Sequence, residues 1–361
     1  MIPLALTAPL PYEANPGIIE GVAPKGTTAV RVRADGRSVR VLRLKSGKRA
    51  FLLGPIGLPP RDITVTVEAL AGKRVLAATT VDHVFGLPAA AATVAPPRTI
   101  NAKVQARLST LPARTGASSA AWVRDLGTGS TAAYNAGAHY PGASTMKLAI
   151  LLGVLARDDV DPVRSSAWTL ERALVLSSSN AAANALLPRA GGAAVVDEVA
   201  QSLGATATFT CCGYLLEPGE RGYSARQVRR KPLPPAAIVD QPTFPCCKYT
   251  TAHDLGTLLV SLTLAASGHG PALRHGITAR EARVALWLLI HAGNPGLVRP
   301  AVAFPVGHKA GWLPEIQHDA ALVFSPRGTL VAVFMNYSAR GVSYARTRAA
   351  ARDVVHLALR R

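Results

Sequence analysis

The segment Leu87–Arg98 (LPAAAATVAPPR) separates two stretches of the chain whose apolar residues follow different periods. It carries no charge before Arg98 and contains three prolines, a composition typical of a linker. Before it, residues alternate as in short β-strands, whereas after it apolar residues also recur at helical spacing, as in Val104–Leu111. A chain of 361 residues is long enough for two domains. We therefore predict a β domain over 12–86, this segment (87–98) as a linker, and a second domain over 99–361.

Turn and strand signals alternate through the first domain. Thr28–Arg33 and Ser38–Leu44 flank Ala34-Asp35-Gly36-Arg37, in which Asp-Gly is a strong hairpin signal. Ile63–Leu70 (ITVTVEAL) alternates β-branched residues with others, as a half-buried strand does. These patterns predict a small β-sandwich, which resembles the immunoglobulin-like modules of bacterial exported enzymes. The domain contains no cluster of candidate catalytic residues, so we expect it to act as a spacer or docking unit.

Strand patterns stand at both ends of the second domain, and helical patterns lie between them. The predicted hairpins are Ala120–Leu126 with Thr131–Asn135, and Ala320–Phe324 with Thr329–Phe334. The predicted helices cover about 144–157, 180–187, 193–203, 251–267 and 343–359. This order predicts an α/β (α+β) sandwich in which helices cover one antiparallel sheet.

The chain is strongly basic, with 40 Lys and Arg against 21 Asp and Glu and a formal net charge of +19. The excess is spread along the sequence, Arg226–Lys231 is the only dense basic run, and aromatic residues that could stack on bases make up only 5%. We therefore expect no nucleic-acid partner and favour an anionic surface such as the cell envelope. The longest near-apolar runs, Leu148–Ala156 and Leu255–Ala266, are far shorter than the roughly 20 residues that span a bilayer, so no transmembrane segment is predicted.

The cysteines form two adjacent pairs, Cys211-Cys212 and Cys246-Cys247. An even number is compatible with two disulfide bridges between the pairs, formed in an oxidising compartment. Free buried thiols and a four-thiolate metal site are the alternatives, but adjacent cysteines fit the usual Cys-x-x-Cys zinc spacing poorly. We therefore predict bridges, no metal and no cofactor. The location that follows is extracytoplasmic, secreted or in the cell envelope, although no signal peptide is evident in this chain.

Ser144-Thr145-Met146-Lys147 is an S-x-x-K pattern that opens an apolar helical run. Residues three apart lie on one helix face, so the Lys147 amine can lie beside the Ser144 hydroxyl. The helix N-terminus favours a developing alkoxide, and a partly desolvated lysine has a lowered pKa and can take the proton. The alternative is an N-capping serine followed by a solvated lysine.

Two further segments carry polar residues suited to the same chemistry. Ser178-Ser179-Asn180 precedes a second helical run, where small polar residues also serve as caps. Lys309-Ala310-Gly311-Trp312 comes just before the final hairpin. A lysine followed by small residues on a strand supplies positive charge and lets a substrate backbone approach closely.

The order and context of the three segments resemble the serine β-lactamase and penicillin-binding-protein superfamily, and class A β-lactamases most closely. The family's boxes are S-x-x-K, S-D-N and K-T/S-G, and here they are Ser144–Lys147, Ser178–Asn180 and Lys309–Gly311. The flanks Asn180–Asn184 and Thr250–Leu255 also resemble the family's. The resemblance covers about 100–361.

The resemblance implies a role for each matching residue. Ser144 is the acylated nucleophile, Lys147 is its activating partner, and Ser178 relays a proton to the leaving nitrogen. Lys309 attracts the substrate carboxylate and tunes Ser178. The oxyanion hole consists of the backbone N–H groups of Ser144 and Trp312.

Substrate binding and deacylation are where the chain departs from the family. Asn180 is expected to hold the substrate's side-chain amide, but Ser179 replaces the family's Asp. Ala310 removes the hydroxyl that binds the substrate carboxylate, and His308 is the candidate to compensate for it. Glu217 is the candidate deacylating residue, although four residues later the chain has Arg221 instead of Asn.

Three functions follow from this resemblance. The preferred one is a serine hydrolase that forms an acyl-enzyme on Ser144 and hydrolyses β-lactam amides. The first alternative is a D-alanyl peptidase or penicillin-binding protein that acts on peptidoglycan peptides. The second is a noncatalytic envelope-binding protein. β-Lactamases and penicillin-binding proteins share the motifs for the acylation step, so these motifs do not distinguish them. A Glu217 that supports deacylation would indicate a β-lactamase.

Overall fold

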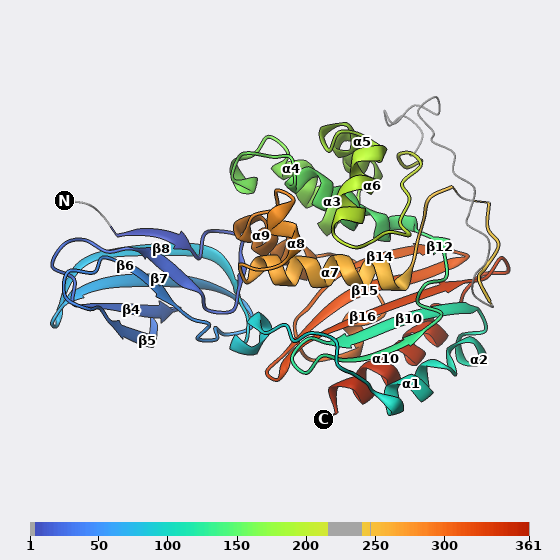
Figure 1. Cartoon of the computed structure of the whole chain (residues 1–361), viewed down its shortest axis with the longest axis horizontal. Coiled ribbons are helices and arrows are strands. Elements are labelled where there is room, and N and C mark those ends of the chain that lie inside the picture. The colour runs from blue at the N-terminus through green and yellow to red at the C-terminus, as the bar shows by residue number, and fades with distance from the viewer. Residues whose placement is uncertain (1–3, 216–239, 246, 361) are drawn as a thin grey trace. The chain divides into compact units, whose positions relative to one another are not determined.

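The computed structural model describes residues 4–215, 240–245 and 247–360. The candidate residues Glu217 and Cys246, and the basic run Arg226–Lys231, lie outside the described residues. The chain divides into two compact units (Figure 1). The first comprises Met1–Thr93 and Phe324–Gly328, and the second comprises Val94–Val323 and Thr329–Arg361.

The first unit is built from two β-sheets. Its strands are β1 (Ala5–Ala8), β2 (Ala14–Asn15), β3 (Ile19–Val22), β4 (Ala29–Ala34), β5 (Arg37–Arg43), β6 (Ala50–Leu53), β7 (Asp62–Ala71) and β8 (Arg74–Gly86). One sheet has the order β1-β3-β6 and the other β2-β8-β7-β4-β5. Ile19 and Phe51 of the first sheet share a core with Val32 and Val67 of the second. The predicted all-β region is therefore present, and its relation to immunoglobulin-like modules stays a prediction.

Local chemistry explains the hairpin between β4 and β5. Asp35 and Gly36 have φ angles of 47° and 77°, the left-handed conformation that Asp and Gly tolerate best in a two-residue turn. The two strands pair antiparallel from Ala29↔Arg43 to Ala34↔Arg37. This predicted hairpin is confirmed.

The second unit is organised around a six-stranded sheet. Its strands are β9 (Thr99–Ile100), β10 (Ser118–Asp125), β11 (Ser130–Tyr134), β14 (Val306–Leu313), β15 (Ile316–Ser325) and β16 (Gly328–Tyr337), in the order β14-β15-β16-β10-β11-β9. β10 and β16 pair antiparallel from Ser118↔Tyr337 to Asp125↔Leu330, so segments from both ends of this unit meet in the middle of the sheet. The sheet is antiparallel as predicted, except at one edge, where the short β9 runs parallel to β11.

Helices cover this sheet on both sides (Figure 1). On one side are α1 (Ala102–Leu108), α2 (Leu111–Thr115) and α10 (Tyr344–Leu359). On the other are α3 (Lys147–Leu155), α4 (Trp168–Leu176), α5 (Asn180–Arg189), α6 (Ala193–Ser202), α7 (Ala252–Ala266), α8 (Pro271–Arg274) and α9 (Ala279–Ile290). A Cβ on Gly256 of α7 would lie 2.2 Å from the Trp122 ring of β10, so glycine allows this helix to reach the sheet. The fold is the predicted α/β sandwich.

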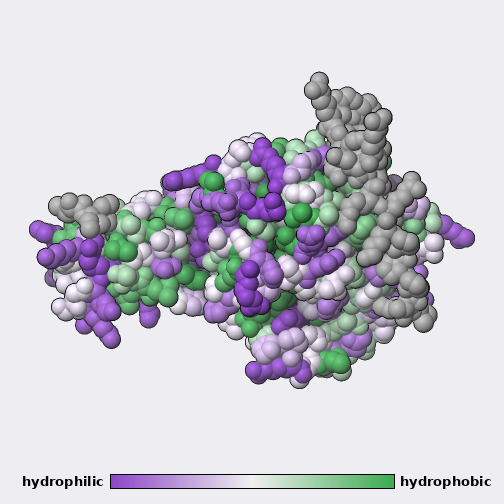
Figure 2. Space-filling view, turned by 45° about the horizontal axis from the view of Figure 1, so that its top comes forward, coloured by the Kyte–Doolittle hydropathy of each residue, from purple (hydrophilic) through white to green (hydrophobic). Residues whose placement is uncertain are grey.

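Short elements complete the second unit. The strands β12 (Tyr140–Pro141) and β13 (Tyr249–Thr250) form a separate two-stranded ladder. The 3₁₀ turns in the described part of this unit are η2 (Ala143–Met146), η3 (Pro162–Arg164) and η5 (Arg299–Ala301), and η1 (Ala89–Ala92) lies at the end of the first unit. None of the helices in the described ranges combines the length and apolar character needed to cross a membrane. Figure 2 shows hydrophilic and hydrophobic residues interspersed on the face in view.

Candidate active site

Ser144 lies in the 3₁₀ turn η2, and helix α3 begins at Lys147. The turn is closed by Thr145, whose Oγ1 donates to Gly142 O. The Lys147 side chain is completely buried, and every residue of α3 is buried as well. The S-x-x-K spacing therefore places an amine in the interior, directly beside a hydroxyl.

Lys147 Nζ is surrounded by oxygen atoms from the first two predicted segments. It lies 3.1 Å from Ser144 Oγ, 3.3 Å from Ser178 Oγ and 2.7 Å from Asn180 Oδ1, and it donates to Ser178 O. The Ser178 carbonyl and Asn180 Oδ1 can only accept, so they take two N–H groups. A neutral amine has two such groups, and its lone pair is then left for a hydroxyl. The arrangement therefore permits Lys147 to take the Ser144 proton.

The orientation of Asn180 is set by a second contact. Its Nδ2 donates to Leu215 O at 3.0 Å, and because a carbonyl can only accept, the amide nitrogen points there and Oδ1 faces Lys147. The neighbouring Ser179 is the N-cap of α5 and accepts from Ala182 N at 3.1 Å. Replacing the family's Asp by Ser at position 179 therefore retains a helix cap.

Ser178 has a φ of 55°, in the left-handed region that non-glycine residues rarely adopt. Such a conformation costs on the order of 1–3 kcal/mol. Here it turns both the carbonyl and the hydroxyl of Ser178 towards Lys147. Lys309 Nζ donates to the same hydroxyl at 2.8 Å. Ser178 Oγ therefore lies between two amines, which is the position a proton relay needs.

The third predicted segment lies on the edge strand β14, against η2. A Cβ on Gly311 would lie 3.1 Å from the backbone nitrogens of Ser144 and Thr145, so only glycine allows the strand to come this close without displacement. Ala310 is buried, and its carbonyl accepts from Lys309 Nζ at 3.1 Å. The side chain of Trp312 is 66% exposed. β14 thus brings Lys309 and Gly311 to the same turn as Ser144.

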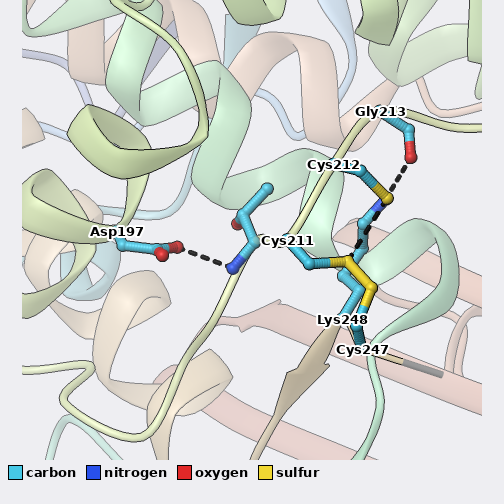
Figure 3. Close-up of a disulfide and its surroundings, with 7 residues drawn as sticks. Asp197, Cys211, Cys212, Gly213, Cys247 and Lys248 are labelled. Carbon is cyan, nitrogen blue, oxygen red and sulfur yellow. Dashed lines mark hydrogen bonds between the residues drawn. A yellow bond between two sulfur atoms is a disulfide. The ribbon is translucent and has the colours of Figure 1, made fainter. Parts of the chain in front are cut away.

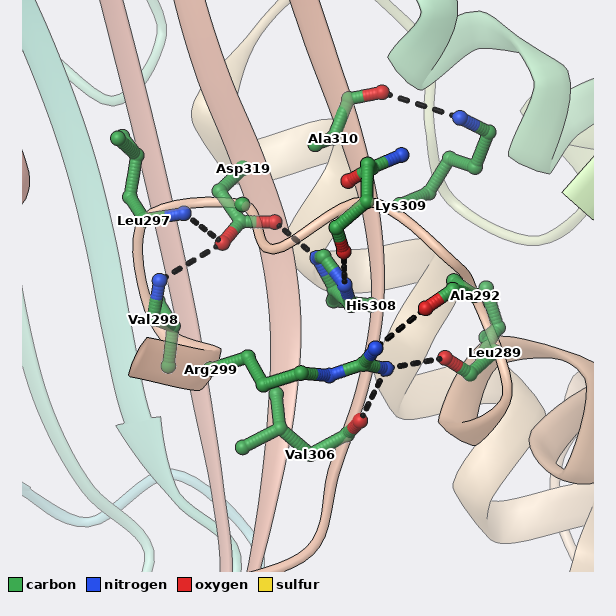
Figure 4. Close-up of polar contacts among 12 residues, drawn as sticks. Leu289, Ala292, Leu297, Val298, Arg299, Val306, His308, Lys309, Ala310 and Asp319 are labelled. Carbon is green, nitrogen blue, oxygen red and sulfur yellow. Dashed lines mark hydrogen bonds and ion pairs between the residues drawn. The ribbon is translucent and has the colours of Figure 1, made fainter. Parts of the chain in front are cut away.

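His308 does not take the role that the sequence suggested for it. Its side chain is completely buried, with Nδ1 2.8 Å from Asp319 Oδ1 and Nε2 3.0 Å from Asn294 O (Figure 4). The other Asp319 oxygen accepts from Leu297 N at 2.7 Å and from Val298 N at 2.9 Å. His308 is therefore committed to bracing the chain before β14, and it cannot replace the hydroxyl that Ala310 lacks.

The two site lysines have strongly altered acidities. Burial, with a smaller contribution from the Lys309 and Lys248 charges, lowers the pKa of Lys147 to about 7. Burial also lowers the pKa of Lys309 to about 7, whereas the Asp319 carboxylate raises it. Both amines therefore give up a proton far more readily than an ordinary lysine does.

Of the cysteines, Cys211 and Cys247 form a disulfide with a Cα–Cα distance of 5.8 Å. Cys212 Sγ lies 3.3 Å from Cys211 Sγ. A second bridge would need Cys246, which lies outside the described residues, so it stays a prediction. Glu217 is outside them as well, and its proposed role in deacylation is likewise untested by the geometry.

Two residues that the sequence did not indicate reach the site. The Tyr214 ring centroid lies 4.6 Å from Lys147 Nζ, and Lys248 Nζ lies 3.4 Å from the same centroid. No family box contains either residue. The one available signal was the position of Lys248, directly after Cys247 and two residues before the Thr250–Leu255 flank begins.

A serine in the turn before α3, hydrogen-bonded to a buried lysine and surrounded by a second serine, an asparagine and a strand lysine, is typical of a serine β-lactamase or penicillin-binding type of site. The model of the beta-lactamase enzyme family matches residues 101–161 and 153–361, more than half of the chain. The chain therefore belongs to the beta-lactamase enzyme family. A search among curated proteins finds no match to this chain.

Solved structures share the fold at low sequence identity. PBP-A is 20% identical with a TM-score of 0.54, and the match covers 74% of this chain and 98% of that one. A β-lactamase from Burkholderia phymatum is 21% identical with a TM-score of 0.53 and coverages of 72% and 99%. A PBP-A mutant in acyl-enzyme complex with penicillin G is 19% identical, with a TM-score of 0.53 and coverages of 73% and 98%. At these identities the likeness concerns the fold.

Proposed function

We propose that this protein is a serine hydrolase that forms an acyl-enzyme on Ser144 with β-lactam amides. The observation that carries the proposal is the environment of Lys147, whose amine is buried, 3.1 Å from Ser144 Oγ, and matched by two acceptors that occupy its N–H groups. A noncatalytic binding protein would have no need to keep such an amine buried at a cost in desolvation.

Acylation uses the contacts around these residues. Neutral Lys147 takes the Ser144 proton, Oγ attacks the lactam carbonyl, and the carbonyl oxygen develops negative charge next to the N–H groups of Ser144 and Trp312. When the C–N bond breaks, the ring nitrogen receives a proton from Ser178 Oγ. Ser178 is reprotonated by Lys147, which lies 3.3 Å away and carries the proton it took from Ser144. Lys309 attracts the substrate carboxylate and donates to Ser178.

Deacylation distinguishes the β-lactamase from its alternative. In the described part of the chain, the hydrogen-bond partners of Lys147 are hydroxyl, carbonyl and amide oxygens, and none is a carboxylate. The Tyr214 ring centroid lies 4.6 Å from the same amine. This observation favours, as a second candidate, a penicillin-binding protein or D-alanyl peptidase that acts on peptidoglycan peptides and deacylates β-lactam adducts slowly. The preferred function requires Glu217 to supply the deacylating carboxylate.

The proposed location is extracytoplasmic, secreted or in the cell envelope. The Cys211–Cys247 disulfide supports it, because such bridges persist in oxidising compartments. The net charge of +19 supports contact with an anionic envelope surface.

Steady-state turnover tests the proposal. The wild-type protein is mixed with a chromogenic cephalosporin and, separately, with a peptide ending in D-alanyl-D-alanine, with Ser144→Ala as the control. Rapid cephalosporin hydrolysis that is lost in Ser144→Ala and slowed in Glu217→Gln supports the β-lactamase. Release of D-alanine, with a long-lived β-lactam adduct, supports the peptidase. Binding without an adduct or turnover on either substrate would refute catalysis at Ser144.

A further inference from the structure

Two segments next to the site are joined by a β-bridge, a disulfide and side-chain hydrogen bonds. Phe209 and Tyr249 form a β-bridge, with N···O distances of 2.8 and 3.1 Å. The disulfide links Cys211 to Cys247, and Lys248 Nζ donates to Gly213 O at 2.9 Å (Figure 3). The segment that carries Tyr214 and the segment that carries Lys248 are therefore held as one unit.

The Tyr214 ring is fixed over the amines by further contacts. Asn184 accepts from Tyr214 N at 2.6 Å and donates to Tyr214 O at 2.8 Å, so the backbone of this residue is held on both sides. The hydroxyl donates to Ala143 O at 3.1 Å, next to Ser144. Lys248 Nζ, on a side chain that is 5% exposed, lies 3.4 Å from the ring centroid, within the range of a cation–π contact.

We propose that Lys248 is a positioning residue for acylation of Ser144: it holds the Tyr214 ring over the Lys147 amine, and the Cys211–Cys247 disulfide holds Lys248 in place. The inference rests on the proposed acylation of Ser144 and adds the residues that prepare its base. Lys248 acts through Tyr214 and Lys147, and it does not contact the reacting hydroxyl.

Two physical effects connect Lys248 with Lys147. The ring covers the amine and keeps water from it, and burial is the largest cause of the lowered pKa of Lys147. The Lys248 ammonium also repels a proton on Lys147. The titratable groups that face Lys147 in the described residues are Lys309 on β14, Lys248 before β13 and Tyr214 in the loop. Both effects favour the neutral amine, the form that can accept the Ser144 proton.

Lys248→Met tests the role of the charge, because methionine keeps an unbranched apolar side chain and removes the ammonium. The second-order rate constant for labelling by a fluorescent penicillin is measured from pH 5 to 9. Loss of a like charge raises the pKa of Lys147, so the acid limb is expected to move up by about half to one pH unit, which slows labelling at pH 6 by about three- to tenfold. Lys248→Arg keeps the charge and is expected to restore the wild-type midpoint.

Controls separate this role from a structural one. Lys103→Met removes an exposed lysine of α1 and is expected to leave the profile unchanged. If Lys248→Met is labelled more slowly at every pH but the midpoint of its pH profile is unshifted, Lys248 only anchors the loop, and the proposal is overturned. An unchanged pH profile would overturn it as well. If wild-type protein is not labelled at all, the proposed function fails before this inference is reached.

The disulfide provides a second measurement that does not depend on the folding of Lys248→Met. Cys247→Ala removes the disulfide that holds the segment with Lys248. We expect Ser144 of this variant to be labelled more slowly on the acid limb of the pH profile, with the midpoint moved to higher pH as in Lys248→Met. Circular dichroism checks that the variant is folded. Labelling by folded Cys247→Ala that matches wild type at every pH would overturn the part of the proposal that concerns the disulfide.

Discussion

The acidity of Lys147 predicts how fast Ser144 reacts at each pH. With a pKa of about 7, about half of the amine is neutral at pH 7 and about one part in a hundred at pH 5. A lysine with its ordinary pKa would be neutral in only about three parts in ten thousand at pH 7. If neutral Lys147 is the base, acylation slows about fiftyfold between pH 7 and pH 5, by about tenfold for each unit well below the pKa.

The rate of covalent labelling by a fluorescent penicillin measures this dependence, because it reports acylation without requiring deacylation. The perturbation is a series of buffers from pH 5 to 8, applied to wild type and to Lys147→Ala. Removing the base is expected to slow labelling by about 10² to 10⁴-fold and to abolish the acid limb.

Two results would refute this reasoning. One is a wild-type labelling rate that stays level from pH 5 to 8, which would mean that no group with a pKa near 7 controls acylation. The other is an acid limb that persists at the same midpoint in Lys147→Ala, which would assign the titration to a different group.

Three further predictions concern buried groups of the second unit. Glu171 is completely buried, its carboxyl oxygens have no hydrogen-bond partner among the described residues, and burial raises its pKa to about 8. The pKa of Glu171 is therefore higher in the folded state than in the unfolded state, so the free energy of unfolding should fall, by at most about 5 kcal/mol, as the pH rises from about 4.5 to 8. Glu171→Leu should remove this loss, whereas replacing an exposed glutamate by Glu198→Leu should not. Urea denaturation at pH 5 and pH 8 measures the difference. Asp319→Asn leaves too few acceptors for His308 and two backbone N–H groups, so it should lower the free energy of unfolding by about 2–4 kcal/mol, and an unchanged urea midpoint would contradict this. Gly311→Ala pushes β14 away from η2 and should slow labelling of Ser144 by tenfold or more with little change in the melting temperature, whereas a wild-type labelling rate would show that the close approach is not needed.

Local patterns predicted much of the fold, and the failures have physical causes. Asp35-Gly36 predicted its hairpin correctly because the turn depends on two residues with positive φ. Helix α9 was missed because its last six residues (285–290) are all apolar, and a short apolar run cannot be assigned to a helix or a strand by its period alone. The start of the helix did carry a local signal, the capping box between Thr278 and Glu281. The pairing of β10 with β16 depends on contacts between distant segments, which no local pattern contains.

In the site, too, contacts between residues close in sequence were predicted, and contacts between distant segments were not. Ser144 and Lys147 are three residues apart, so helical geometry brings their side chains together, and the sequence alone predicted this contact. The contacts of Tyr214 and Lys248 with the site arise from a disulfide and a β-bridge between segments about forty residues apart. His308 was misplaced because a strand residue next to Lys309 alternates to the other side, where Asp319 binds it.

The central claim is that Ser144 forms the acyl-enzyme, and mapping the adduct tests it most directly. The protein is mixed with penicillin G, quenched with acid and digested, and the modified peptide is located by mass spectrometry in wild type and in Ser144→Ala. We predict one penicilloyl group per chain, on Ser144, and none in the variant. An adduct on another residue, or the same adduct in Ser144→Ala, would contradict the account.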